Sequence, residues 1–184
     1  MKKIILIFLL LQLIFFLQAY TIMSIKGEEN VKEVISAKPV YMIFTADNVL
    51  IWKESYEKLV KDEIAKGNKM PTFKEMKENM YKNFAQPVKF KGKKWGMKMI
   101  NNISEAKDGY VIHINVDRVI PAPMAGLTGR YTIKGYKAGS KNALFSADMK
   151  ITQISGVCTI PRCALASVGK MLGEEFFGFM RRGK

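Results

Sequence analysis

The chain has 184 residues and a formal net charge of +14, from 30 Lys and Arg against 16 Asp and Glu. It contains only two cysteines and one histidine, so a structural zinc site, which usually needs four Cys or His ligands, is excluded on ligand count. No G-x-S-x-G, H-E-x-x-H or P-loop motif is present, which disfavours an enzyme. We therefore expect no metal site, no cofactor and no catalytic centre.

The N-terminus has the pattern of a signal peptide. Lys2 and Lys3 form a short positive region, and residues 4–17 are apolar except for Gln12. We expect cleavage after Ala19, which makes residues 1–19 a signal peptide. The alternative is an uncleaved membrane anchor that extends to about residue 25, because no charge occurs between Lys3 and Lys26 and about 20 mostly apolar residues can cross a bilayer.

Removal of residues 1–19 leaves about 165 residues, enough for one domain with a real core. We expect a polar tether at 20–38 and a single domain at 39–184. The two lysines of the signal are its only charges, so the exported part keeps a net charge of +12. A field of this sign attracts lipid headgroups, acidic glycans and acidic proteins.

The first half of the domain contains one expected strand and two expected helices. Pro39 to Phe44 is apolar on both faces, as in a buried central strand. Trp52 to Lys66 shows helical spacing of apolar residues, with Gly67 placed to end the helix. Residues 46–48 either cap this helix or lead into a short strand at 49–52. Thr72 and Glu75 form a capping box for a second helix, which should end near Gln86, before Pro87.

The second half predicts mainly strands. Val88 to Met99 alternates apolar and basic residues around Gly92, which is typical of a hairpin. Tyr110 to Ile120 also alternates, with Ile112 and Ile114 on one face and His113 and Asn115 on the other. An irregular loop at 121–129, strands at 130–137 and 143–154, and a final helix from Thr159 to Arg182 follow. The order indicates an α+β fold with an antiparallel or mixed sheet and helices packed on one face.

The two cysteines are Cys158 and Cys163. In an exported protein such a pair is more often a disulfide than two thiols, so we expect a local bridge around Pro161. The spacing differs from the C-x-x-C of redox-active pairs. Because Cys158 is the first cysteine, lipid attachment at the signal cleavage site is excluded.

The strongest functional signal is a basic and aromatic stretch from Lys66 to Met99. Within it, the expected anion-binding residues are concentrated on the predicted hairpin: Lys89, Lys91, Lys93, Lys94 and Trp95. The competing interpretation is that the aromatic residues face the core and the lysines form an ordinary solvated face. His113, the only histidine, lies about 13 Å along the strand from Asp117, too far for a direct hydrogen bond, so a catalytic role is disfavoured.

These observations favour an exported, non-catalytic envelope or secreted protein, periplasmic or secreted after signal cleavage. It would bind a partner protein or an anionic surface, such as lipid headgroups or acidic glycan, and no specific nucleic acid. One alternative is a factor anchored in the membrane by residues 4–25, or a membrane-active factor that uses the segment around Phe176 and Phe179. A small exported hydrolase is the least favoured hypothesis.

Overall fold

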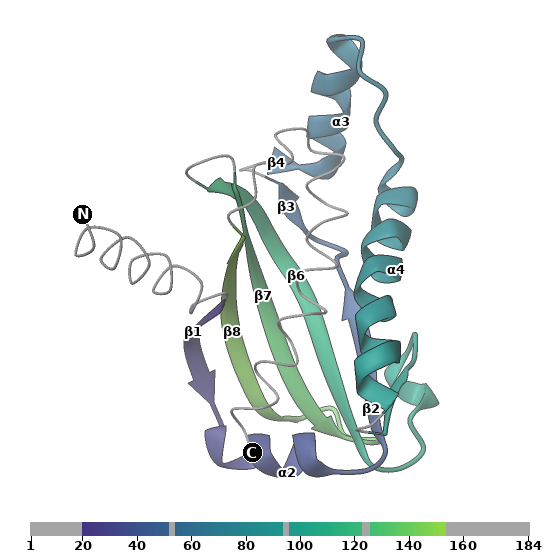
Figure 1. The fold of residues 1–184 in the computed structure, drawn as a ribbon, viewed down its shortest axis with the longest axis vertical. Helices are drawn as coiled ribbons and strands as arrows, with labels where there is room; N and C mark the ends of the chain where they lie inside the picture. The colour runs from purple at the N-terminus through teal and green to yellow at the C-terminus, as the bar shows by residue number, and fades with distance from the viewer. Residues whose placement is uncertain (1–19, 52–53, 94–95, 123–125, 154–184) are drawn as a thin grey trace, which may run out of the picture.

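The structure, a computed structural model, describes residues 20–51, 54–93, 96–122 and 126–153 (Figure 1). The expected signal peptide at 1–19, the expected C-terminal helix and the expected Cys158–Cys163 disulfide lie outside the described residues.

One mixed eight-stranded sheet forms the centre of the molecule, in the order β1-β8-β7-β6-β2-β5, with β3 paired to β6 and to β4. β2 runs parallel to β5 and β6, whereas β6, β7, β8 and β1 are successively antiparallel. This architecture confirms the predicted α+β class. The strands are β1 (Tyr20–Lys26), β2 (Val40–Thr45), β3 (Leu50–Ile51), β4 (Glu54–Ser55), β5 (Met97–Met99), β6 (Tyr110–Ala122), β7 (Gly126–Lys137) and β8 (Ala143–Gln153).

The helices of the described part are α2 (Val31–Ser36), α3 (Tyr56–Ala65) and α4 (Phe73–Gly92), with short 3-10 turns η1 (Glu28–Asn30) and η3 (Ile103–Glu105). The capping box predicted at Thr72 and Glu75 starts α4. Gly67 follows α3 with a φ of 81°, a left-handed conformation that glycine adopts without strain. Figure 1 shows α4 running along the sheet and α3 projecting beyond its end.

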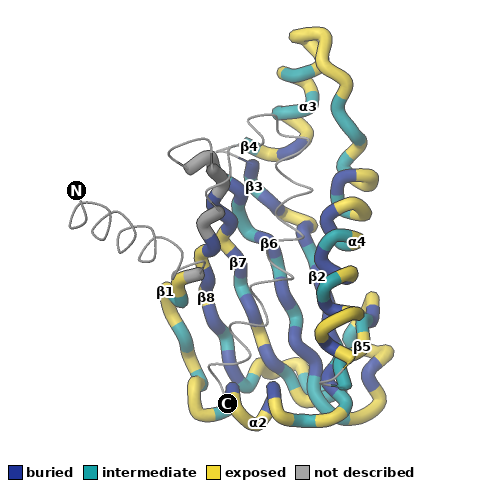
Figure 2. The backbone as a smooth tube through the Cα atoms, viewed as in Figure 1, coloured by how far each residue is buried: buried dark blue, intermediate teal, exposed yellow. Residues whose placement is uncertain are grey.

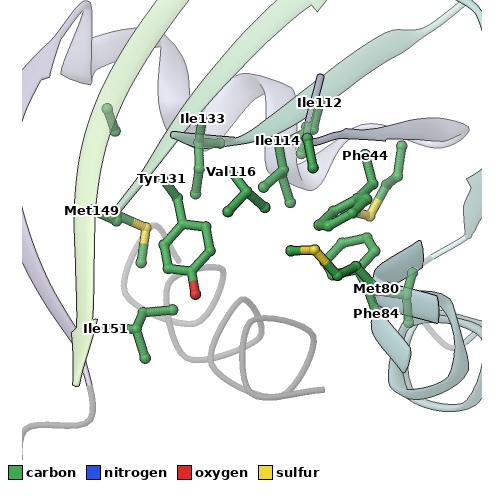
Figure 3. Packing of buried hydrophobic residues seen from close by; sticks show 14 of the residues in the cluster. Phe44, Met80, Phe84, Ile112, Ile114, Val116, Tyr131, Ile133, Met149 and Ile151 are labelled. Atoms are coloured by element: carbon green, nitrogen blue, oxygen red, sulfur yellow. The ribbon is translucent and has the colours of Figure 1, made fainter. Parts of the chain in front are cut away.

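The core lies on one face of the sheet. Ile112, Ile114 and Val116 of β6 are fully buried there, as their alternation predicts. α4 packs Met76, Met80, Phe84 and Val88 into the same cluster. The ring of Phe84 stacks on Phe44 of β2, with ring centroids 4.8 Å apart. Figures 2 and 3 show the buried strand centres and this packing, with Tyr131, Met149 and Ile151 completing the cluster.

The expected tether at 20–38 is wrong, because this segment belongs to the fold. β1 forms an antiparallel edge strand beside β8. α2 then buries Val31, Val34 and Ile35 against the core. These three apolar residues anchor a segment whose other positions are mostly polar, and the charged residues around them led to the prediction of a tether.

The predicted end of the second helix is also wrong, because α4 continues through Pro87 to Gly92. A proline inside a helix removes one hydrogen bond and its ring crowds the carbonyl four residues earlier. Phe84 and Val88 flank Pro87 and are both buried in the core. We attribute the continuation to this packing, which holds the last turn against the sheet despite the local cost.

Two further boundaries differ from the predictions. The helix expected from Trp52 begins at Tyr56, with Ser55 as its N-cap, because residues 50–51 and 54–55 form the β3–β4 pair. Residues 52–53 lie outside the described residues. The loop expected at 121–129 is shorter, since β6 extends to Ala122 and β7 begins at Gly126. On its β3 side, β6 is paired only at Arg118 and Val119 among the described residues. The backbone of Pro121 therefore has no strand partner on that side, and proline is tolerated at such an edge.

Candidate functional site

The first candidate site is the C-terminal half of α4. Lys82, Lys89 and Lys93 are spaced by seven and four residues, so they share one face of the helix, and all three are exposed. Phe90 lies beside them and is 85% exposed, which is the highest value among the large apolar side chains of the described part. Lys82, Lys89, Phe90 and Lys93 are referred to below as the basic α4 surface.

Within the described residues, no carboxylate forms an ion pair with a lysine of the basic α4 surface. The ion pairs of the described part are Lys58–Glu54, Lys66–Glu63 and Lys77–Asp47. The last pair holds the first half of α4 to the loop after β2, with Nζ and Oδ1 2.6 Å apart. No pair involves the three lysines of the surface. The sequence contains no Asp or Glu between Glu78 and Glu105, so the positive charge of this region is not offset locally.

The structure corrects the expected hairpin at 88–99. Residues 88–92 are helical, and β5 pairs parallel with β2. Val88 and Gly92, four residues apart, are buried on the helix face, which leaves Phe90 outside. A short run that alternates apolar and basic residues fits a strand as well as the end of a helix, and here packing selected the helix. Lys94 and Trp95 lie outside the described residues.

Lysines near a helix C-terminus also stabilise the helix through its dipole, which is a purely structural use of such residues. That explanation covers Lys89 and Lys93, but it does not account for an apolar ring placed in solvent beside them. Burying the ring of Phe90 against another surface would be favourable. The combination of the two features therefore makes this helix end a candidate contact surface.

A second candidate is a row of polar side chains on the opposite face of the sheet. It crosses five strands. Its hydrogen bonds join Thr45 to His113 (2.7 Å), Thr45 to Asn115 (2.8 Å), Asn115 to Asp117 (2.7 Å), Thr132 to Asp117 (2.8 Å) and Ser24 to Asp148 (2.6 Å). The Thr132 hydroxyl also lies 3.4 Å from the Asp148 carboxylate, and its single proton can go to only one of the two carboxylates at a time. His113 and Asp117 are thus connected through two intermediate side chains. They make no direct hydrogen bond to each other, as the strand geometry predicted.

The directions of these hydrogen bonds follow from the donors available. The Asn115 amide donates through Nδ2 to the Asp117 carboxylate, which can only accept. Its Oδ1 therefore faces Thr45 and takes the single hydroxyl proton of that residue. The Oγ1 of Thr45 then accepts from Nε2 of His113. The neutral imidazole consequently carries its proton on Nε2, and Nδ1 has the free lone pair.

The electrostatic environment favours the neutral form of His113. Its partial burial and the neighbouring Lys134 ammonium lower the pKa of the imidazole, while Asp47 opposes the shift. Besides the row itself, the ring borders two depressions. One, of about 200 Å³, is lined with Asn115, Asp117, Thr132 and Lys134. The other is larger and extends toward η3.

This arrangement does not activate Thr45 as a nucleophile. A general base must present a lone pair to the proton it removes, whereas His113 donates its Nε2 proton to Thr45 and Thr45 donates away from it. Within the described residues, no group of three or more His, Cys, Asp or Glu side chains is placed to hold a metal ion. No helix of that part is long and apolar enough to span a membrane.

The sequence placed His113, Asn115 and Asp117 on one face of a strand but did not identify their partners. Thr45 lies in the neighbouring strand, 68 residues before His113. The pairing of β2 with β6 brings Thr45 opposite Asn115, and this register is a long-range property. The polar alternation of 113, 115 and 117 was the only available signal.

Comparison with known proteins gives a limited result. No protein-family model matches the chain, and no curated protein matches it. The fold resembles solved structures of PelC from Paraburkholderia phytofirmans. A dodecamer of a single-substitution variant is 11% identical, with a TM-score of 0.41, over 84% of this chain and 96% of that chain. A second PelC dodecamer is 9% identical, with a TM-score of 0.37, over 84% and 94%. No conclusion on function or assembly is based on this likeness.

Proposed function

We propose that this is an exported, non-catalytic envelope or secreted protein that binds an anionic membrane surface through the basic α4 surface. The observation that supports this proposal most strongly is the 85% exposure of Phe90 beside three lysines that make no ion pair in the described part. Export is supported by the signal-peptide pattern of residues 1–19.

Membrane binding uses both features of the surface. Each lysine near an anionic bilayer contributes about 1 kcal/mol, and the contribution decays within a Debye length. A phenylalanine ring that enters the interfacial region adds a contribution from the burial of apolar area, which salt does not screen. An acidic glycan would use the lysines without needing the ring. Phe90 therefore favours a lipid surface over a soluble polyanion.

A non-catalytic role is supported by the direction of the hydrogen bonds around His113. Thr45 is the hydroxyl that contacts the ring, and its proton is directed to Asn115. A small exported hydrolase that used Thr45 as its nucleophile would require this order to be reversed. An activity that disappears in His113→Ala, with the fold retained, would revive that hypothesis.

The test is sedimentation with vesicles of phosphatidylglycerol and phosphatidylcholine in equal amounts, against pure phosphatidylcholine vesicles. We expect binding only to the anionic vesicles, weakened by salt. The triple variant K82Q/K89Q/K93Q should lose most of it. The matched control K107Q/K137Q/K150Q removes the same charge at exposed lysines elsewhere and should bind better than the first triple.

The ring is tested separately with Phe90→Ser. For a membrane surface, this variant should weaken vesicle binding and leave the salt dependence unchanged. If Phe90→Ser binds like the parent, or if both lysine triples bind equally, the proposed surface is wrong. Binding to heparin that needs the lysines but not Phe90, without vesicle binding, would instead indicate an acidic glycan. The intact mass and cell fraction of the native protein test the export.

A further inference from the structure

A hollow of about 610 Å³ opens beside the polar row, between the segment around η3 and the turn that joins β7 to β8. None of the residues that line it belongs to the basic α4 surface. Its volume is within the range of small-molecule sites. The apolar part of the lining consists mainly of Ile43, Ile103, Ala106 and Tyr136. These residues also belong to the small apolar cluster that Val111 and Ile100 complete on this face of the sheet.

The walls of the hollow are held in place by hydrogen bonds that do not depend on a ligand. The Ile100 N–H donates to the carbonyl of Met42, 3.0 Å away, and ties the η3 segment to β2. At the start of η3, Glu105 accepts from the backbone N–H groups of Asn101 and Asn102 at 3.2 and 3.0 Å. On the other side, the N–H of Ala138 donates to Gly109 at 3.0 Å. The hollow is therefore preformed, which lowers the entropic cost of binding.

Lys141 is the only Lys, Arg, Asp or Glu side chain among the described residues that line the hollow. Lys141 lines it and makes no ion pair in the described part, and none of its lining residues is acidic. The nearby carboxylate of Glu105 is engaged by backbone N–H groups. The carboxylate of Asp108 accepts from the Tyr41 hydroxyl at 3.2 Å. The lining also includes polar side chains without a described hydrogen-bond partner, such as Ser104.

We propose that the hollow binds a small amphipathic carboxylate, with its apolar body on Tyr136, Ile43 and Ile103 and its carboxylate at Lys141. The apolar lining requires a ligand that buries a ring or a short acyl chain, which excludes inorganic anions as the preferred class. The lysine, which makes no ion pair in the described part, favours a negative charge on that ligand. This site is separate from the basic α4 surface, so its occupancy does not depend on the proposed membrane binding.

The single histidine provides a direct measurement of occupancy. His113 lines the hollow, so the imidazole C–H signals of the untagged protein report on it without assignment of other residues. The probe is 2-naphthoate, added at constant pH and ionic strength. We expect a saturable shift of these signals. The neutral analogue 2-naphthalenemethanol should bind about tenfold more weakly, because it lacks the charge-assisted contact.

Two variants test the assignment. Lys141→Ala should weaken 2-naphthoate binding by about tenfold, whereas Lys150→Ala, which removes an equal charge nine positions later on β8, should not. Ser104→Phe, which fills the hollow without changing its charge, should abolish the shift. The proposal is overturned if the His113 signals do not move at millimolar 2-naphthoate, if the alcohol binds equally well, or if the two lysine variants are alike. Vesicle binding should be unchanged in Lys141→Ala. A failure of 2-naphthoate binding can therefore be distinguished from a failure of the proposed membrane binding.

Discussion

Oγ1 of Thr45 lies 2.7 Å from Nε2 of His113, and the hydroxyl accepts this hydrogen bond because its own proton goes to Asn115. One hydroxyl therefore satisfies two side chains on the neighbouring strand. The row that it begins is continued by Asp117 and Thr132, so that four strands are linked from β2 to β8. Removal of this hydroxyl should therefore leave two polar side chains of the row without a partner.

Thr45→Val should destabilise the protein although valine has nearly the same shape. It leaves Nε2–H of His113 and Oδ1 of Asn115 without their partner in a half-buried site, at a cost of about 1–3 kcal/mol. Chemical denaturation should show a lower free energy of unfolding. Thr45→Ser keeps the hydroxyl and is the matched control, expected to retain most of the stability. Equal losses in both variants would show that the methyl group matters and the hydrogen bonds do not.

The stability of the protein should fall as the pH drops through the titration of His113. Burial and Lys134 lower the pKa of the imidazole below its ordinary value of 6.5. Between the lowered pKa and 6.5, the unfolded chain binds more protons than the folded one, so stability rises with pH in that window. Above pH 6.5 the protein keeps its full stability. Below the pKa of the folded state, the loss of stability due to His113 is complete.

Lys134→Gln tests this mechanism, because it removes the repulsive charge and leaves the burial. The pKa of His113, followed by its imidazole proton signals, should move upward in the variant, toward 6.5. Lys137→Gln removes a charge three residues further along β7 and should shift the pKa less. If the two variants give the same pKa, the neighbouring ammonium is not the cause of the shift.

The sequence was sufficient for elements with a long, regular pattern. The alternation of β6, the apolar run of β2 and the Thr72 capping box are local signals, and the structure confirms all three. The signals failed where the local pattern was ambiguous. Residues 88–92 alternate like a strand, but packing of Val88 against the sheet keeps them helical.

The candidate sites were less predictable than the fold. Lys89, Lys91 and Lys93 were chosen for their charge, and the exposure of Phe90 became evident only once α4 was seen to continue past Pro87. The hollow at η3 depends on the parallel pairing of β2 with β6 and on the β7–β8 turn. Such contacts join residues far apart in sequence, and no local pattern encodes them.

Gly135→Ala should be destabilising for steric reasons. Gly135 lies directly opposite Phe145 in the β7–β8 ladder, and a Cβ at this position would come within 2.2 Å of the Phe145 ring. Phe145 is buried, so the ring cannot move away without a change in the core. We expect a loss of about 1–3 kcal/mol in the free energy of unfolding.

The matched control for Gly135→Ala is Gly139→Asn in the β7–β8 turn. A Cβ there has nothing within 4 Å, and asparagine tolerates the φ of 78°. This variant should remain close to the parent in denaturation experiments. A tolerated Gly135→Ala would mean that Phe145 packs elsewhere in solution.

Pro87→Ala distinguishes the observed helix from the hairpin that the sequence suggested. In a continuous α4, alanine restores an N–H that can bond to the carbonyl of Asn83 and removes the crowding by the proline ring. Part of this gain is offset, because proline also restricts the unfolded chain. We expect a net increase of about 1–2 kcal/mol in the free energy of unfolding and more helical signal in circular dichroism. Gln86→Ala, at an exposed neighbouring position, should change stability by only a few tenths of a kcal/mol. If Pro87→Ala is destabilising, the chain turns at this proline, and Phe90 and the lysines around it do not form one helical surface.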